Sequence, residues 1–244
     1  MVAVGLKTYL GWTQTTQWLD AVAASCARFG SQLDIVVLPT APLLPHAVAT
    51  GRRSGFQVGA QQISEHPPGA FTGELPAALL QELGVSYAEI GHAERRSLFG
   101  ETLDVVRAKV AACQAAGLTP LLCVGEGLLG HTAVTPAAEA ATQTCRQLAE
   151  ALADCDRAAP LLVAYEPVWA IGAQQPAPME HVRMVAATIR EELRPYRAAR
   201  LIYGGTAGPG LFAGIEDSVD GLFLGRRSHD PAAFNTTLSE VARA

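Results

Sequence analysis

The sequence has 244 residues, of which 49% are hydrophobic, and its 23 acidic against 18 basic side chains give a formal net charge of −5. This composition suits one large buried core, while the acidic balance and the lack of any basic run of five or more residues argue against nucleic acid or acidic membranes as partners. No apolar run approaches the roughly 18 residues of a membrane span, and the start "MVAVGLK" contains no basic leader, so we expect a cytoplasmic protein. The five cysteines are odd in number and widely spaced, which predicts reduced packing residues.

Short apolar runs rich in β-branched residues alternate along the chain with stretches of helical spacing. The predicted strands are residues 2–6, 34–38, 56–60, 87–90, 120–124, 161–165, 200–203 and 221–224. The clearest predicted helices are residues 13–29, 103–116, 136–153 and 179–193. Because no linker interrupts the series, we predict one domain over residues 1–244. Apolar strands of this kind form parallel sheets buried on both faces, and eight of them, each followed by a helix, favour a single (β/α)8 TIM barrel of the α/β class. A doubly wound open sheet is the alternative.

In such a barrel, catalytic groups lie at the carboxyl ends of the strands. The first predicted strand ends at Lys7 and the sixth at Glu166, and the others end in short motifs. These motifs are "IGHAE" (90–94), "CVGE" (123–126), "YGGTAG" (203–208) and "LGRR" (224–227). A lysine, a histidine, several carboxylates and two glycine-rich turns are therefore expected on one rim.

Glu166 is followed by "PVWAIG" (167–172), which is more apolar than a surface loop should be. A carboxylate covered by an apolar lid loses water and becomes more basic, which suits it to take a proton from carbon. A strand-end carboxylate paired with an arginine is the simpler alternative.

Lys7 is one of two lysines among sixteen arginines, which indicates that a compact point charge is needed at its position. The stretch "YGGTAGPG" (203–210), together with "LGRR", predicts a phosphate site, because glycine-rich turns let backbone N–H groups approach an anion; a plain turn is the alternative. We expect no metal and no cofactor, since there is no strand-linked G-x-G-x-x-G near the N-terminus and the histidines are scattered. The histidines are His46, His66, His92, His131, His181 and His229.

Five separated motifs resemble those of the triosephosphate isomerase family, in the family's order and spacing across nearly the whole chain. They are "GAFTGE" (69–74), "YAEIGHAERRSLFGET" (87–102), "LLCVGE" (121–126), "AYEPVWAIG" (164–172) and "YGGTAG" (203–208).

The resemblance implies a role for each matching residue. Glu166 would be the base that moves a proton between the carbons flanking the carbonyl. His92 would be the neutral electrophile that polarises this carbonyl, a tuning for which triosephosphate isomerase itself is the standard example. Lys7 would stabilise negative charge on the enediolate and the phosphate. Glu94 and Cys123 would contact these catalytic groups without touching the substrate, and Glu94 would hold Lys7 or His92 in place.

The resemblance also implies that residues 167–177 close as a lid, as in triosephosphate isomerases. The lid would be apolar to keep water from an enediol phosphate that otherwise eliminates its phosphate. Gly172, Thr206 and Gly225 would donate N–H or O–H groups to the phosphate. Loop 69–74 resembles the loop that inserts into a neighbouring subunit beside its lysine, which implies a homodimer.

Three departures from the family pattern affect the predicted site. Gly5 stands where the family has an asparagine, so one hydrogen-bond donor, worth on the order of 10²–10³ in rate, is missing and space is expected there. Arg226 replaces the second glycine of a Gly-Gly pair and could grip a phosphate or reach an additional hydroxyl. Pro176 and Pro178 stiffen the end of the lid. Neutral drift is the alternative explanation for all three.

The sequence therefore predicts a cofactor-free aldose-ketose isomerase of a small sugar phosphate. Glyceraldehyde 3-phosphate and dihydroxyacetone phosphate are the default pair, which would place the protein in glycolysis. A four-carbon tetrulose phosphate such as erythrulose phosphate, from tetritol breakdown, is the rival substrate. Two other classes remain open: a Schiff-base aldolase using Lys7, although such barrels commonly carry the lysine on strand six, and a catalytically silent sugar-phosphate binder.

Overall fold

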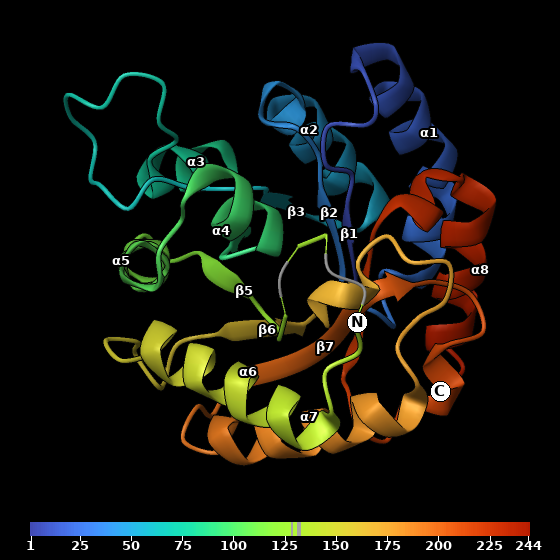
Figure 1. The fold of residues 1–244 in the computed structure, drawn as a ribbon. Helices are drawn as coiled ribbons and strands as arrows, with labels where there is room; N and C mark the ends of the chain where they lie inside the picture. The colour runs from blue at the N-terminus through green and yellow to red at the C-terminus, as the bar shows by residue number, and fades with distance from the viewer. Residues whose placement is uncertain (128, 131–132) are drawn as a thin grey trace.

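The computed structural model describes residues 1–127, 129–130 and 133–244. Eight parallel strands pair in chain order and the last pairs with the first, so the sheet closes into a barrel (Figure 1). The predicted (β/α)8 barrel is confirmed, and the open-sheet alternative is wrong. The strands are β1 (Val2–Gly5), β2 (Ile35–Leu38), β3 (Gln57–Ala60), β4 (Tyr87–Ile90), β5 (Thr119–Val124), β6 (Leu161–Tyr165), β7 (Ala199–Ala207) and β8 (Gly221–Leu224).

The α-helices form a ring outside the strands (Figure 1). They are α1 (Trp12–Phe29), α2 (Leu44–Ser54), α3 (Ala77–Leu83), α4 (Ala93–Phe99), α5 (Leu103–Ala115), α6 (Ala137–Ala151), α7 (Met179–Leu193) and α8 (Pro231–Val241). The four helices predicted from the sequence are all present, with ends that differ by two residues at most. None of the helices in the described segments is long and apolar enough to cross a membrane.

The chain between β7 and β8 departs from the expected strand-then-helix order. Residues 208–220 are all described and form only a 3-10 turn, η3 (Phe212–Gly214), because the stretch begins Gly-Pro-Gly, which disfavours a helix. The glycine-rich stretch 203–207 also differs from a simple turn. It continues β7, and the pairing with β8 shifts register between Tyr203 and Ala207.

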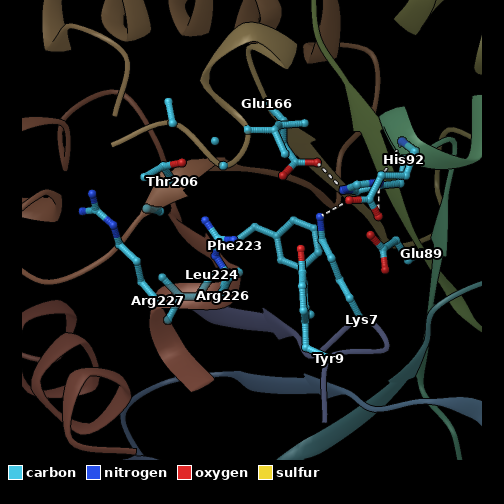
Figure 2. Close-up of a pocket in the computed structure, with 18 of the residues that line it drawn as sticks. Lys7, Tyr9, Glu89, His92, Glu166, Thr206, Phe223, Leu224, Arg226 and Arg227 are labelled. Carbon is cyan, nitrogen blue, oxygen red and sulfur yellow. Dashed lines mark hydrogen bonds and ion pairs between the residues drawn. The ribbon is translucent and has the colours of Figure 1, made fainter. Parts of the chain in front are cut away.

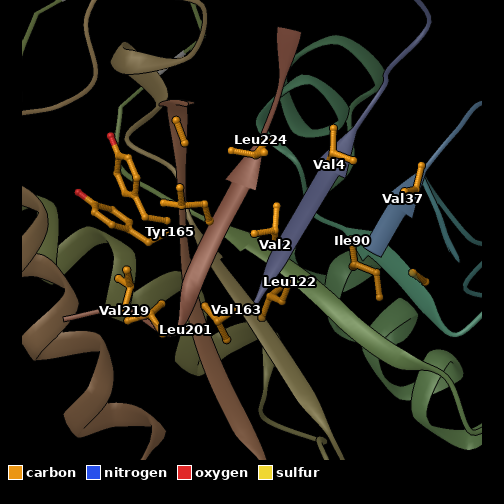
Figure 3. Packing of buried hydrophobic residues seen from close by; sticks show 14 of the residues in the cluster. Val2, Val4, Val37, Ile90, Leu122, Val163, Tyr165, Leu201, Val219 and Leu224 are labelled. Carbon is orange, nitrogen blue, oxygen red and sulfur yellow. The ribbon is translucent and has the colours of Figure 1, made fainter. Parts of the chain in front are cut away.

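Side chains of successive strand residues alternate between two buried layers. Val2 and Val4 of β1 belong to the outer layer between strands and helices, seen in Figure 3 with Leu122, Val163 and Leu224. The inner layer fills the barrel and contains residues of the opposite parity: Met1, Ala3, Val36, Leu38, Tyr87, Leu121, Cys123, Leu162, Ala164, Ile202 and Phe223.

The same parity assigns two further residues to the barrel interior, Gly5 of β1 and Glu89 of β4. Glu89 is the exception among apolar neighbours, because it is a carboxylic acid that is only 8% exposed. All five cysteines are unpaired, as expected, and three of them are buried.

Candidate active site

A cavity of about 270 Å³ lies at the carboxyl ends of the strands (Figure 2). Lys7, His92 and Glu166 all line it, although they come from three distant parts of the sequence. The rim predicted from strand ends is therefore where these three side chains meet.

Glu166 follows β6 and is held between two neighbouring strand ends. Its N–H donates to the Val124 carbonyl at 2.9 Å, and its side chain is only 8% exposed. A Cβ on Gly204 would lie 2.5 Å from Glu166 Oε1, so glycine is needed there to admit the carboxylate. Oε2 lies 3.6 Å from His92 Nε2 and has no hydrogen-bond partner among the described residues. One carboxylate oxygen is thus buried and unpaired beside an imidazole, which suits it to accept a proton from a bound molecule.

His92 is the N-cap residue of α4, and its Nδ1 accepts a hydrogen bond from the Glu94 backbone N–H at 3.1 Å. An accepting Nδ1 assigns the ring proton to Nε2, the nitrogen that faces Glu166. Burial lowers the pKa of His92, and the positive charges of Lys7 and Arg96 lower it further against the opposing effect of Glu166 and Glu94. The ring is therefore neutral near pH 7 and presents an N–H donor.

Lys7 forms an ion pair with Glu94, with 2.5 Å between Nζ and Oε1. Burial alone would lower the pKa of Lys7, but the hydrogen bond and charge of Glu94, with Glu166 and Glu89, raise it above its usual value. Glu94, which was expected to hold Lys7 or His92 in place, lies beside both, with its Oε2 3.7 Å from His92 Nδ1. Lys7 has φ 50°, and among the described residues Thr206, with φ 69°, is the only other non-glycine with positive φ. Both line the cavity, as expected of strain at a functional site.

The predicted phosphate-binding residues gather on the opposite side of the cavity, where Gly172, Thr206, Gly225 and Arg226 all contribute to the lining. A Cβ on Gly225 would meet nothing within 4 Å, so a ligand can approach this backbone closely. The Thr206 hydroxyl donates to the Ala170 carbonyl at 2.7 Å, so its own proton is engaged with the lid. Arg226 is exposed.

The lid segment, residues 167–177, contacts both flanks of the site. Trp169 Nε1 donates to Glu126 Oε1 at 2.8 Å, and the Ala177 N–H donates to the Tyr203 hydroxyl at 3.1 Å. Arg227 donates from Nη2 to the Gln174 carbonyl, which ties the lid to the loop after β8. These contacts hold the lid segment against β7 and against the segments that follow β5 and β8.

Cys123 does not line the cavity. Its Sγ lies 3.9 Å from Glu89 Oε1, and burial raises the pKa of the thiol well above its usual value. A protonated, buried thiol acts as a packing group behind Glu89.

Several residues that line the cavity were not singled out by sequence analysis, and two of them, Glu89 and Phe223, shape its inner wall. The signal for Glu89 was a charged residue at an interior position of the apolar stretch "YAEI". Phe223 changes the expectation for Gly5, because a Cβ at residue 5 would lie 3.4 Å from the Phe223 Cζ. The space vacated by the missing asparagine is thus partly filled by an aromatic ring.

Comparison with known proteins places this geometry in a family. A family model described as triosephosphate isomerase matches residues 1–241. The chain belongs to the triosephosphate isomerase family. The sequence-based assignment to this family is confirmed, and so is the prediction of an isomerase.

Relatives within the triosephosphate isomerase family carry two different names. L-erythrulose-1-phosphate isomerase of Pectobacterium atrosepticum is 42% identical over 98% of this chain and 95% of its own length. Triosephosphate isomerase of Leifsonia xyli is 44% identical over 95% of this chain and 88% of its own length. The crystal structure of triosephosphate isomerase from Bartonella henselae superposes with a TM-score of 0.82 at 28% identity, covering 100% of this chain and 98% of that one.

Within the described part of this family member, no group of three or more His, Cys, Asp and Glu side chains could hold a metal ion. His131, one of the scattered histidines, lies outside the described residues.

Proposed function

We propose that this member of the triosephosphate isomerase family is a cofactor-free isomerase of a four-carbon ketose phosphate, with L-erythrulose 1-phosphate as the favoured substrate. The observation that carries the four-carbon assignment is the composition of the cavity wall inside the barrel mouth. Gly5 has no side-chain amide to offer there, and Phe223 and Glu89 form part of the wall. The similarity to the Pectobacterium enzyme over nearly the full length supports it. The three-carbon pair remains the second candidate, supported by the triosephosphate isomerases of comparable identity.

Proton transfer starts at Glu166 in this proposal. The unpaired Oε2 takes a proton from the carbon beside the carbonyl, inside a site that the lid shields from water. His92 donates its Nε2 proton toward the substrate oxygen on which negative charge develops. Lys7, held by Glu94, adds a positive charge to the same region.

The same chemistry serves three and four carbons. In L-erythrulose 1-phosphate the carbonyl is at C2, and a proton leaves C3 to give an enediolate across C2 and C3. Return of a proton to C2 reduces C2 to an alcohol while C3 becomes the ketone, so no atom or electron leaves the molecule. The product, numbered from its other end, is erythrulose 4-phosphate. Both isomers are ketoses, because a hydroxymethyl group replaces the aldehyde hydrogen of the three-carbon substrate.

The phosphate would bind between the lid and the loops after β7 and β8. Gly172 and Gly225 offer backbone N–H groups there, and a glycine at each position leaves room for an anion to approach. Thr206 contributes its N–H, since its hydroxyl proton is already engaged with Ala170. Arg226 adds charge at the open edge of the same region.

The active form would be a cytoplasmic homodimer. Loop 69–74 projects from the barrel between β3 and α3 (Figure 1), and Phe71 in it is exposed. A second cavity of about 450 Å³ lies beside Lys7 and is bordered by the exposed side chains of Leu98 and Phe99. The loop of a second subunit, with an apolar tip, fits such a surface.

The deciding experiment is kcat/KM of the purified protein with dihydroxyacetone phosphate, glyceraldehyde 3-phosphate and both enantiomers of erythrulose phosphate under one condition. A preference of more than about tenfold for a four-carbon substrate, about 1.4 kcal/mol of transition-state discrimination, supports the proposal. Preference for the three-carbon pair would overturn the four-carbon assignment and leave the isomerase assignment in place. A borohydride-trapped adduct would indicate the aldolase, and no turnover with any substrate would indicate a silent binder.

A further inference from the structure

Glu89 is a buried carboxylic acid at the junction of two cavities. It lines the cavity of about 270 Å³ that holds Glu166 and the cavity of about 450 Å³ beside Lys7. Its side chain comes from β4 and belongs to the barrel interior, together with the apolar side chains of the inner layer. Burying a carboxyl group in such a layer is unfavourable unless it has a partner.

The partners of Glu89 within the described chain do not satisfy it. Its Oε1 has one weak contact, from Cys123 Sγ at 3.9 Å, and no hydrogen bond to Oε2 is present in the described residues. Lys7, the cation facing it, is already paired with Glu94. A buried polar group with a free oxygen on a cavity wall is suited to bind a ligand.

The carboxyl group of Glu89 is protonated at neutral pH. Its pKa is raised to about 8, mainly by burial. The negative charges of Glu166, Glu94 and Glu101 also raise this pKa, and the positive charge of Lys7 lowers it. A neutral carboxyl has both an O–H donor and a carbonyl acceptor, which matches the two hydrogen-bonding capacities of a hydroxyl group.

We propose that Glu89 is a specificity-determining residue, which hydrogen-bonds the terminal hydroxymethyl group that distinguishes a four-carbon from a three-carbon substrate. This inference rests on the proposed function and names the residue that sets its chain length.

The direction of the substrate in the cavity supports this role. Its fourth carbon is bonded to C3, the reacting carbon farther from the phosphate, so it extends from Glu166 away from the phosphate site. Figure 2 shows Thr206 and Arg227 on one side of the pocket and Glu89 on the other, beyond Lys7 and next to His92. A hydroxymethyl group that leaves the reacting carbons in this direction meets Glu89.

The test compares the wild-type protein with Glu89→Leu and Glu89→Gln. Leucine has a similar volume and no hydrogen bond, whereas glutamine keeps one donor and one acceptor. The readout is the ratio of kcat/KM for L-erythrulose 1-phosphate to kcat/KM for dihydroxyacetone phosphate, measured on one preparation. This ratio is independent of the fraction of folded protein. We expect Glu89→Leu to lower it by about tenfold or more, and Glu89→Gln to keep it within about threefold of wild type.

A pH profile distinguishes recognition from packing. The four-carbon kcat/KM of wild type should fall as pH rises through about 8, because an ionised Glu89 no longer donates a proton. This decrease should be absent in Glu89→Gln. The other titratable and charged groups facing Glu89 are unchanged in this variant: Lys7, His92, Glu94, Glu101, Cys123 and Glu166.

The outcomes separate this inference from the proposed function. A wild-type protein that does not turn over four-carbon substrates refutes the proposed function, and this inference with it. A wild-type protein that prefers four carbons, with Glu89→Leu keeping the same ratio, refutes the role of Glu89 and leaves the proposed function intact. An identical alkaline limb in wild type and Glu89→Gln also refutes that role.

Discussion

The Phe223 ring lies opposite Gly5 at the mouth of the barrel, where a Cβ on Gly5 would lie 3.4 Å from Cζ of the ring. The two residues belong to neighbouring strands, β1 and β8, and both face the interior. The large side chain of Phe223 therefore packs at the position where residue 5 has no side chain.

Restoring the family asparagine alone should fail, because its Cβ would already touch the Phe223 ring and the amide beyond the Cβ would need further room. We expect Gly5→Asn to lower the free energy of unfolding by about 1–3 kcal/mol, the usual cost of overpacking, and to lower turnover of every substrate. The double variant Gly5→Asn/Phe223→Leu should recover stability and raise the three-carbon kcat/KM by about tenfold or more, since it regains an amide donor. Urea denaturation and steady-state kinetics test both expectations. Improved three-carbon turnover in the single variant would show that the ring is easily displaced.

This pair also shows where sequence reasoning reached its limit. The alternation of strands and helices predicted the barrel, and the strand ends identified Lys7 and Glu166, because parallel strands bring their carboxyl ends together. The packing of Phe223 opposite Gly5 involves residues far apart in the chain, so spacing carries no information about it. Glu89 was visible as a polar residue in an apolar strand, but only the closed barrel shows that it faces the cavity.

Glu166→Gln tests the proposed base. The amide keeps the shape of the carboxylate but accepts no proton, so we expect kcat to fall by about 10³-fold, within the range of general-base contributions. Exchange of solvent deuterium into the substrate should be lost in parallel. Glu180→Gln, an exposed carboxylate at the start of α7, is the matched control and should stay within about twofold of wild type. If Glu166→Gln exchanged solvent deuterium into the substrate at the wild-type rate, the base would be another residue.

Glu94→Gln tests whether Glu94 positions Lys7. Without the ion pair of 2.5 Å, burial should dominate and lower the pKa of Lys7. With dihydroxyacetone phosphate, which lacks the hydroxymethyl group proposed to contact Glu89, we expect kcat/KM to fall by about tenfold and its alkaline limb to move to lower pH, because Lys7 loses its charge earlier. Glu82→Gln, an exposed residue on α3, serves as the control. A smaller kcat/KM with an unmoved alkaline limb would indicate a purely structural role.

His92 should make stability depend on pH in the acid range. Its pKa is lowered by burial in the folded state, so the unfolded chain binds a proton first as pH falls below its ordinary value of 6.5. Lower pH stabilises the state that binds more protons, which here is the unfolded chain. The free energy of unfolding should therefore decrease as pH falls through 6.5, and His92 should not affect it well above pH 6.5. Urea titrations of wild type and His92→Gln from pH 5 to pH 8 isolate the effect, because the other histidines contribute equally to both. We expect the stability of wild type relative to His92→Gln to drop only below about pH 6.5. A constant difference over the whole range would mean that His92 has the same pKa in the folded and unfolded chain, which would contradict the lowering of its pKa by burial.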